Sequence, residues 1–434
     1  MKKDILDRII GIYYVILIIA LCFMGGLSSY DVFYSDFISN TLIGFGIVAL
    51  ILYVIYRIRN NSTRYWDLII LIMSFLGYLS YYYAFDKKVA LKGFLLGREG
   101  LLVIYTYYMT FLLSSVLKNT KMKNRILMTV TICGALQVIY GLLQVFRISN
   151  IFGLPIVGNW KYASGFVFNS NFFGSYMVLL NGLWMSRFFF DKEINYKNFL
   201  ILFIFITGLL ISGAMSAVVA LLVMFCLVVF INVINKQNNI RLFLRKIGMY
   251  LVSILLIYSV IVLWTKSDLT KDIKELYTQS VSTVSGNVDE SFGTGRIYIW
   301  KEALKYLPDY IYTGIGIDNF AYIGHRDGTY IYDSPKKDNI IYKAHNEYLQ
   351  ILVTEGIFMF VTYLIFLGSI FYTGVKNIKN EKNKNLIVCS LLLMFIGYSV
   401  QAFFNISMTL IAPIFFMISG MLVSCCEEKI VKEC

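Results

Sequence analysis

The sequence predicts an all-α, polytopic integral membrane protein with about twelve transmembrane helices and a large helical extracytoplasmic loop. Of the 434 residues, 58% are hydrophobic and only 15% are charged, and the mean hydropathy is +0.68. Aromatic side chains, which anchor helices at membrane interfaces, make up 17% of the chain. Because a lipid-exposed backbone must satisfy its hydrogen bonds within helices or closed barrels, this composition indicates membrane-spanning helices.

Hydrophobic runs of roughly 17–22 residues, long enough for a hydrocarbon core of about 30 Å, recur along the chain. The first run resembles the core of a signal peptide, but no small-residue cleavage site follows it, so we interpret it as a retained span. The sequence divides into transmembrane helices one to nine (1–264), a large loop (265–344), and helices ten to twelve with a cytoplasmic tail (345–434). The spans lie near residues 9–27, 40–57, 66–85, 100–117, 126–146, 171–189, 197–212, 214–234, 247–264, 355–374, 386–403 and 407–425.

The net charge of +13 indicates basic cytoplasmic loops rather than binding to nucleic acid, which we do not expect. The connections after the even-numbered spans are rich in Lys and Arg, so these connections and both termini are expected to face the cytoplasm. The seven cysteines lie in predicted spans or near the C-terminus without metal-type spacing, which argues against a zinc site or a disulfide framework.

Two segments on the expected outer side break this pattern. Residues 86–99 carry Lys87, Lys88, Lys92 and Arg98, which indicates either a bound external anion or a snorkelling interfacial helix. The segment 265–344 is far longer than an ordinary connection, and such loops are usually functional or disordered. Its middle, Arg296 to Phe320, predicts a helical cap because apolar residues recur at helical spacing: Ile299, Trp300, Ala303, Leu304 and Leu307.

The stretch Ala344–Gly356 contains His345, one of only two histidines in the chain. At helical spacing, His345 would share a face with Tyr348, Leu349 and Leu352. It is then either an interfacial residue that caps a helix start or a titratable group at the membrane edge. The other histidine, His325, lies in a turn-like Gly-His-Arg-Asp-Gly cluster and is predicted to be a surface residue.

Four short motifs, taken in chain order, resemble those of the O-antigen ligase and polymerase superfamily. The resemblance covers roughly residues 160–370, and it implies a bacterial membrane glycosyltransferase with a GT-C-like fold. The motifs contain Asn169, Asn171 and Gly174; Arg296, Trp300 and Ala303; Gly314, Gly316 and Phe320; and His345, Asn346, Tyr348, Leu349, Leu352, Glu355 and Gly356.

One position departs from the pattern of this superfamily. Many relatives carry a Ser-Arg pair in the turn that corresponds to Ser212–Ala217, whereas this chain has Met215 at the expected arginine position. If that arginine binds lipid pyrophosphate in relatives, another cation must replace it here. Arg98 is the candidate because it lies at the outer edge of the fourth span.

The resemblance implies that undecaprenyl-pyrophosphate-linked oligosaccharide repeat units of a surface polysaccharide, such as O-antigen or capsule, are polymerised at the outer face of the cytoplasmic membrane. Arg296, with Arg98 and Lys92, would bind the pyrophosphate, since guanidinium groups hold two oxygens without losing their proton. His345 would take the proton of the acceptor hydroxyl, a task suited to a base with a pKa near 6–7. Direct attack would invert the anomeric carbon. No metal or cofactor is expected, because the chain lacks the Asp-x-Asp pair of many nucleotide-sugar transferases.

The other candidate site residues have structural alternatives. Asn169 and Asn171 either bind substrate or cap the sixth span; Trp300 is a sugar platform or part of the cap core; Tyr348 contacts substrate or packs. Glu355 is expected to be a helix N-terminal charge rather than a partner that orients His345.

Two other functions remain open at this point. One is a ligase that moves the finished lipid-linked glycan to another acceptor; the other, less favoured, is a polysaccharide transporter or flippase. Transporters usually carry polar groups at mid-membrane and show related halves, neither of which this sequence displays. Expected partners are the lipid-linked oligosaccharide and membrane lipid, with a chain-length regulator and a flippase as protein partners.

Overall fold

The computed structural model describes residues 2–25, 32–60, 64–95, 97–148, 150–151, 154–156, 162–235, 239–265, 295–324, 341–380 and 386–433. It confirms an all-α polytopic membrane protein, and each of the twelve expected spans coincides with a helix. Seven of these helices are long and apolar enough by themselves to cross a membrane. The helices are α1 (Lys2–Met24), α2 (Val32–Asn60), α3 (Tyr65–Tyr82), α5 (Leu101–Ser115), α6 (Thr120–Val145), α7 (Ser170–Phe189), α8 (Tyr196–Ile211), α9 (Met215–Asn235), α10 (Ile240–Thr265), α13 (Glu347–Asn380), α14 (Leu386–Ala402) and α15 (Ala412–Glu433).

Shorter elements lie between the long helices. The segment before α5 contains α4 (Lys87–Lys92), and the large loop contains α12 (Arg296–Tyr310) and a 3₁₀ turn, η1 (Phe320–Tyr322), so the predicted helical cap is confirmed in its described part. The sequence did not predict the small antiparallel pair of β1 (Asn150–Ile151) and β2 (Leu154–Pro155). The prediction for His325 lies outside the described residues.

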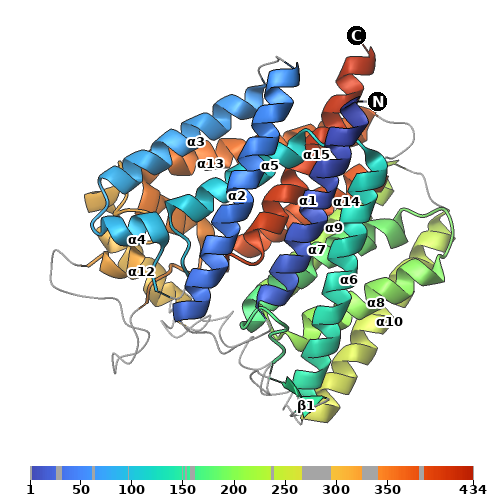
Figure 1. Ribbon diagram of the computed structural model, residues 1–434. Helices are drawn as coiled ribbons and strands as arrows, with labels where there is room; N and C mark the ends of the chain where they lie inside the picture. The colour runs from blue at the N-terminus through green and yellow to red at the C-terminus, as the bar shows by residue number, and fades with distance from the viewer. Residues whose placement is uncertain are drawn as a thin grey trace.

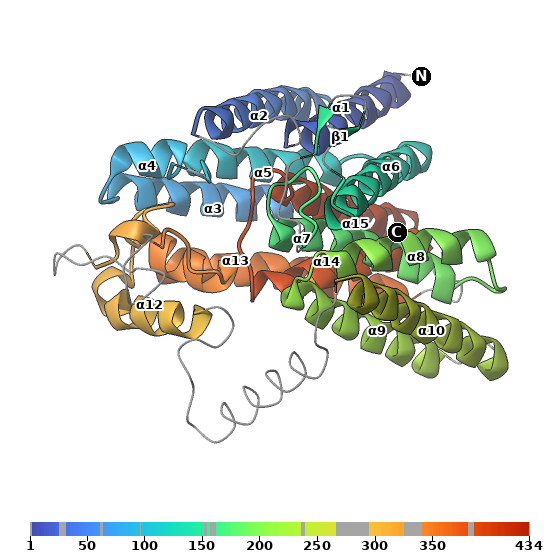
Figure 2. The ribbon, with the colours of Figure 1, turned by 90° about the horizontal axis from the view of Figure 1, so that it is seen from below.

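The long helices form a bundle with the two termini at one end and α4 and α12 at the other (Figure 1). Within it, α13 runs beside α3, α15 packs on α5, and α14 packs on α7. The view from below places α12 against the start of α13, at the same side of the molecule as α3 and α4 (Figure 2). Gly182 allows the close approach of α7 and α14, since a Cβ there would lie 2.7 Å from the Met394 nitrogen.

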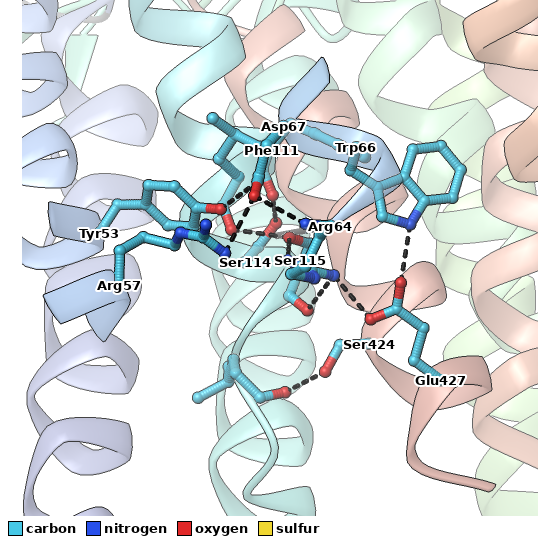
Figure 3. A network of polar contacts seen from close by, with 12 residues as sticks. Tyr53, Arg57, Arg64, Trp66, Asp67, Phe111, Ser114, Ser115, Ser424 and Glu427 are labelled. Carbon is cyan, nitrogen blue, oxygen red and sulfur yellow. Dashed lines mark hydrogen bonds and ion pairs between the residues drawn. The ribbon is translucent and has the colours of Figure 1, made fainter. Parts of the chain in front are cut away.

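A polar network joins four helices at the end that carries the termini (Figure 3). Arg64, before α3, pairs with Glu427 of α15 at 2.7 Å, and the Trp66 indole donates to the same carboxylate at 2.8 Å. Arg57 of α2 pairs with Asp67 of α3 at 3.0 Å. Two cations that the sequence assigned to a cytoplasmic connection are therefore engaged in ion pairs that fasten helix ends together.

A break at Gly356 divides α13 into two parts. Gly356 has φ 84°, a left-handed conformation that favours glycine. The segment that follows α12 is hydrogen-bonded across this break: the Ile357 amide donates to the Ile311 carbonyl at 2.7 Å, and the Gly316 amide donates to the Thr354 carbonyl at 2.9 Å. The tenth helix thus begins eight positions earlier than the expected start at residue 355, and its first part belongs to the cap.

We expect Gly356→Ala to destabilise the docked cap by about 1–3 kcal/mol, the range for a strained backbone position. The alanine would be strained in the left-handed conformation of residue 356, and its Cβ would lie 2.2 Å from the Tyr312 carbonyl oxygen. Thermal unfolding of the protein in detergent measures this loss as a lower Tm.

The matched control for this substitution lies in the same helix. A Cβ at Gly368 meets no atom within 4 Å, so Gly368→Ala is expected to be neutral or to stabilise by up to about 1 kcal/mol. Equal Tm values for the two variants would contradict the importance of the break.

Candidate functional site

The cap has its own hydrophobic core, which gathers three of the four sequence motifs. Ile299 and Ala303 of α12 pack there with Phe320 of η1, Ala344 of the histidine motif and Val353 of α13. This cluster fixes α12 against the beginning of α13. Leu304, which the helical pattern placed on the same face as Ile299, is 52% exposed, so that part of the prediction is wrong.

His345 lies just before α13 and not on it. The Asn346 side chain caps the helix by accepting a hydrogen bond from the Leu349 amide at 3.0 Å, and the helix starts at Glu347. The expectation that His345 shares a helical face with Tyr348 is therefore wrong, as is the alternative that His345 caps the helix. His345 instead has φ 51°, a left-handed conformation that is uncommon for a residue other than glycine.

The residue before His345 is held from both sides. The Trp300 indole donates to the Ala344 carbonyl at 2.9 Å, and the Ala344 amide donates to the Gln350 side-chain oxygen at 2.7 Å. Trp300 also packs edge-on against Phe403, with ring centroids 5.8 Å apart. These contacts support the structural interpretation of Trp300: it positions the histidine turn as part of the cap core.

Arg296, the first residue of α12, lies within electrostatic reach of His345. Its Nε atom is buried and has no hydrogen-bond partner among the described residues. Burial lowers the pKa of Arg296. Burial, and then the positive charges of Arg296 and Lys343, lower the pKa of His345 to about 4. The cap therefore presents a guanidinium beside a neutral imidazole, an arrangement that favours an anion.

The asparagine motif lies at the start of α7 and reaches the site only indirectly. The Asn169 side chain accepts from the Asn171 amide at 2.8 Å, which confirms the capping interpretation for Asn169. The Asn171 carbonyl accepts from the Asn405 side chain at 3.3 Å. Asn405 follows α14 in the same connection as Phe403, whose ring contacts Trp300 and, with centroids 6.3 Å apart, Tyr348. The Tyr348 hydroxyl donates to the Ser399 carbonyl at 2.7 Å, which is a packing role.

The two cations expected from the segment 86–99 differ in their surroundings. Arg98 pairs with Asp36 of α2 at 2.8 Å, and its side chain is only 16% exposed. Lys92 is exposed at the end of α4. Among the described residues, no hydrogen bond or ion pair joins either side chain to Arg296 or His345. Met215, at the expected arginine position, is 50% exposed at the start of α9.

A buried ionic cluster behind the histidine turn was missed by the sequence analysis. Lys343 contacts Asp318 at 2.6 Å and Glu99 at 3.1 Å, and the Ser407 hydroxyl donates to Glu99 at 2.9 Å. Burial opposes the charge of Lys343, but the two carboxylates outweigh it and raise the pKa of this amine. Burial raises the pKa of Asp318, with Lys343 acting in the opposite direction. The one signal in the sequence was that Glu99 and Lys343 lie next to hydrophobic spans, where charged residues are rare.

The same cluster lines a cavity of about 60 Å³, which is room for a few water molecules. Glu347 and Glu355 of α13 also line it, and each has one carboxylate oxygen without a hydrogen-bond partner among the described residues. Glu355 precedes the break at Gly356 and ends a helical segment, so the expected helix N-terminal role is wrong. No hydrogen bond joins Glu355 to His345 among the described residues.

These features define a multi-pass α-helical membrane protein whose helical cap holds a cationic site at one end of the bundle. A family model described as O-antigen ligase matches residues 200–364, which include α12 and the histidine motif. The match supports membership of the chain in the O-antigen ligase/polymerase superfamily. This membership supports ligase-type or glycosyltransferase-like activity on lipid-linked glycans. A comparison with curated proteins gives no match.

The low pKa of His345 can be tested without measuring activity, because the chain has only two histidines. In a His325→Gln background, diethyl pyrocarbonate acylates the remaining imidazole only in its neutral form. We expect acylation to be retained from neutral pH down to a midpoint near 4 and lost below it, because protonation removes the nucleophile.

Arg296→Gln should raise this midpoint, because removal of a neighbouring positive charge stabilises the imidazolium. Arg187→Gln is the matched control: Arg187 is also partly buried, but it lies over the Trp184 ring in the last turn of α7. A wild-type midpoint near 6.5, or equal shifts in both variants, would contradict the described electrostatics.

Proposed function

We propose that this protein polymerises undecaprenyl-pyrophosphate-linked repeat units of a surface polysaccharide at the outer face of a bacterial cytoplasmic membrane. The observation that supports it is the pairing of Arg296 with His345 in the cap, both without a hydrogen bond or ion pair among the described residues. A partly buried guanidinium without a protein counter-charge is costly unless a ligand supplies the charge. A lipid pyrophosphate supplies it, and superfamily membership supports a lipid-linked glycan as substrate.

Arg296 has the chemistry needed for the donor. Its planar guanidinium can bind two phosphate oxygens at once and keeps its charge even when burial lowers its pKa. Negative charge builds on the pyrophosphate as the anomeric carbon–oxygen bond breaks. A fixed cation beside that leaving group therefore stabilises the transition state more than the ground state.

His345 acts as the general base in this proposal. The acceptor hydroxyl attacks the anomeric carbon, the bond to the pyrophosphate breaks with its electron pair, and the hydroxyl proton passes to the imidazole. The configuration at that carbon is inverted, and undecaprenyl pyrophosphate leaves. The proposal needs no metal ion, because Arg296 provides the positive charge.

Binding of the donor is also expected to raise the low pKa of the free His345 imidazole. With a pKa of about 4, His345 is neutral but is a weaker base than the sequence analysis expected. A pyrophosphate bound at Arg296 adds negative charge next to the same imidazole and offsets the effect of the two cations. The pKa of His345 then rises toward the range in which general bases are effective.

The remaining substrate contacts follow from the positions of the other predicted residues. Lys92 is an exposed cation that can approach the outer part of the donor, whereas Arg98 would first have to leave its pair with Asp36. We therefore assign Arg98 a weaker contribution than the sequence suggested. Trp300, Tyr348, Asn169 and Asn171 shape the site mainly through packing and capping contacts.

A ligase is the second candidate function, because the matching family model is described as O-antigen ligase. The same two residues would carry out the same displacement, with a different acceptor for the finished chain. Met215 at the expected arginine position favours the polymerase, because polymerase relatives vary more at such positions than ligases do. A chain-length regulator and a flippase are the protein partners that the polymerase would require.

We expect His345→Ala and Arg296→Ala, expressed at the wild-type level, to abolish chain growth. Loss of one catalytic base commonly costs about 10²–10⁴-fold in rate. For a polymerase, lipid-linked single repeat units should accumulate in the membrane, as measured by extraction and mass spectrometry of the lipid-linked glycans.

The outcome also separates the two candidates, since a failed ligase leaves long lipid-linked polymers. Arg187→Ala, at the other end of α7, serves as the expression-matched control and should make the wild-type product. Normal polymer from both site variants would remove the catalytic assignment.

A further inference from the structure

Lys343 connects four segments that are distant in the sequence. Its ammonium contacts Glu99, just before α5, and Asp318, before η1. Glu99 also accepts from Ser407 in the α14–α15 connection and from Tyr107 of α5, at 2.9 and 2.8 Å. Lys343 itself belongs to the histidine motif segment. The buried ammonium is therefore one of the points at which that segment is attached to the membrane helices.

No other described residue that lines the cavity can supply the positive charge of Lys343. Among the described residues that line the cavity, it is the single cation, and it faces Glu99 and Asp318 directly and acts on Glu347 and Glu355 of α13 from further away. Its side chain is 6% exposed, and those of Glu99 and Asp318 are 4% and 0% exposed. Loss of this ammonium would leave buried carboxylates without a counter-charge, which is strongly unfavourable.

The path from Lys343 to His345 is short and rigid. Ala344 alone separates them; it is fully buried, and both of its backbone polar groups are engaged, with Trp300 and Gln350. His345 follows directly in its left-handed conformation. A displacement of the Lys343 backbone would strain the two hydrogen bonds of Ala344 and, through them, the turn at His345.

We propose that Lys343 is a positioning residue for the imidazole of His345, held in place by its buried ion pairs with Glu99 and Asp318. This inference rests on the proposed function, in which His345 is the base. Lys343 does not contact the substrate in this scheme. It fixes the turn that places His345 beside Arg296, and its charge adds to that of Arg296 in keeping the imidazole neutral until an anion binds.

The test compares Lys343→Gln/Glu99→Gln with Lys343→Arg, both in the His325→Gln background. The double substitution removes one charge of each sign, so the net charge of the cluster is unchanged. We expect kcat for glycan transfer to fall about 100-fold, the cost of a misplaced catalytic group, while KM for the donor changes less than threefold. The diethyl pyrocarbonate midpoint of His345 should move up in pH, because the charge of Lys343 lowers the pKa of His345, whereas Glu99 is not among the groups that shift it.

Lys343→Arg keeps the positive charge but changes the length and shape of the head group. Its midpoint should stay at the wild-type value while kcat falls about tenfold, since the geometry changes and the charge does not. If the double variant fails to fold, Lys343→Arg still tests the proposal. A wild-type kcat for Lys343→Arg would then overturn the proposal.

Lys246→Gln is the matched control. Lys246 is also fully buried and donates to the Asp191 carbonyl at 2.7 Å, just beyond the end of α7 that is remote from the site. It should leave both the midpoint and kcat unchanged.

The outcomes separate the two proposals. A fall in kcat with an unmoved midpoint in the double variant, or the same shift in Lys246→Gln, would overturn the positioning role. A raised midpoint with wild-type kcat would support the link between Lys343 and the imidazole, and it would remove His345 from the reaction.

Discussion

The site depends on one constraint: backbone amides and carbonyls outside the helices must find hydrogen-bond partners inside an apolar protein. In lipid, an unpaired amide or carbonyl costs several kcal/mol, so irregular backbone persists only where protein groups satisfy it. Here buried side chains do so. The Asp318 carboxylate accepts from the Phe94 amide at 2.6 Å, and Gln350 accepts from Ala344. Gln144 accepts from the amides of Ser164 and Gly165 at 2.9 and 3.0 Å before α7.

These bonds make the cap and the bundle one unit. Asp318 holds the segment before α5 through its backbone contacts and holds the histidine motif through Lys343. The same carboxylate therefore satisfies irregular backbone and balances a buried charge. The acids of the cluster face the cavity behind the turn, whereas Arg296 and His345 lie on the cap side. Lys343, next to Ala344, contributes to both environments.

The hydrophobic pattern predicted the helices well because lipid imposes a length and a composition on every span. Even α8 and α14, which are short, were located from their apolar runs. The helical cap over Arg296–Phe320 followed from spacing alone. The face of α12 was less predictable, since Leu304 fits the helical spacing but lies outward. Which side of an amphipathic helix is buried depends on the partner, and here the partner is the segment 315–323, which has no periodic pattern.

The candidate site could be predicted as a set of residues but not as a geometry. Arg296 and His345 were found as motif members, and the fold brings them together through the packing of α12 on α13. Arg98 was selected by its place at the edge of a span, yet Asp36 lies beside it and neutralises it. Lys343, Glu99 and Asp318 are far apart in the chain and carry no joint pattern. Nothing in the linear sequence relates them.

The amino-acid sequence by itself located the apolar helices and a helical cap, and it singled out Arg296 and His345 as the groups proposed to bind an anion and accept a proton. Those properties are local, because they follow from apolar length, helical spacing and side-chain chemistry. The tertiary structure alone decided that His345 stands before its helix in a left-handed turn, that Trp300 holds that turn, and that a buried ammonium ties it to α5. Burial and charge pairing are relations between distant segments, and they exist only once the helices have packed.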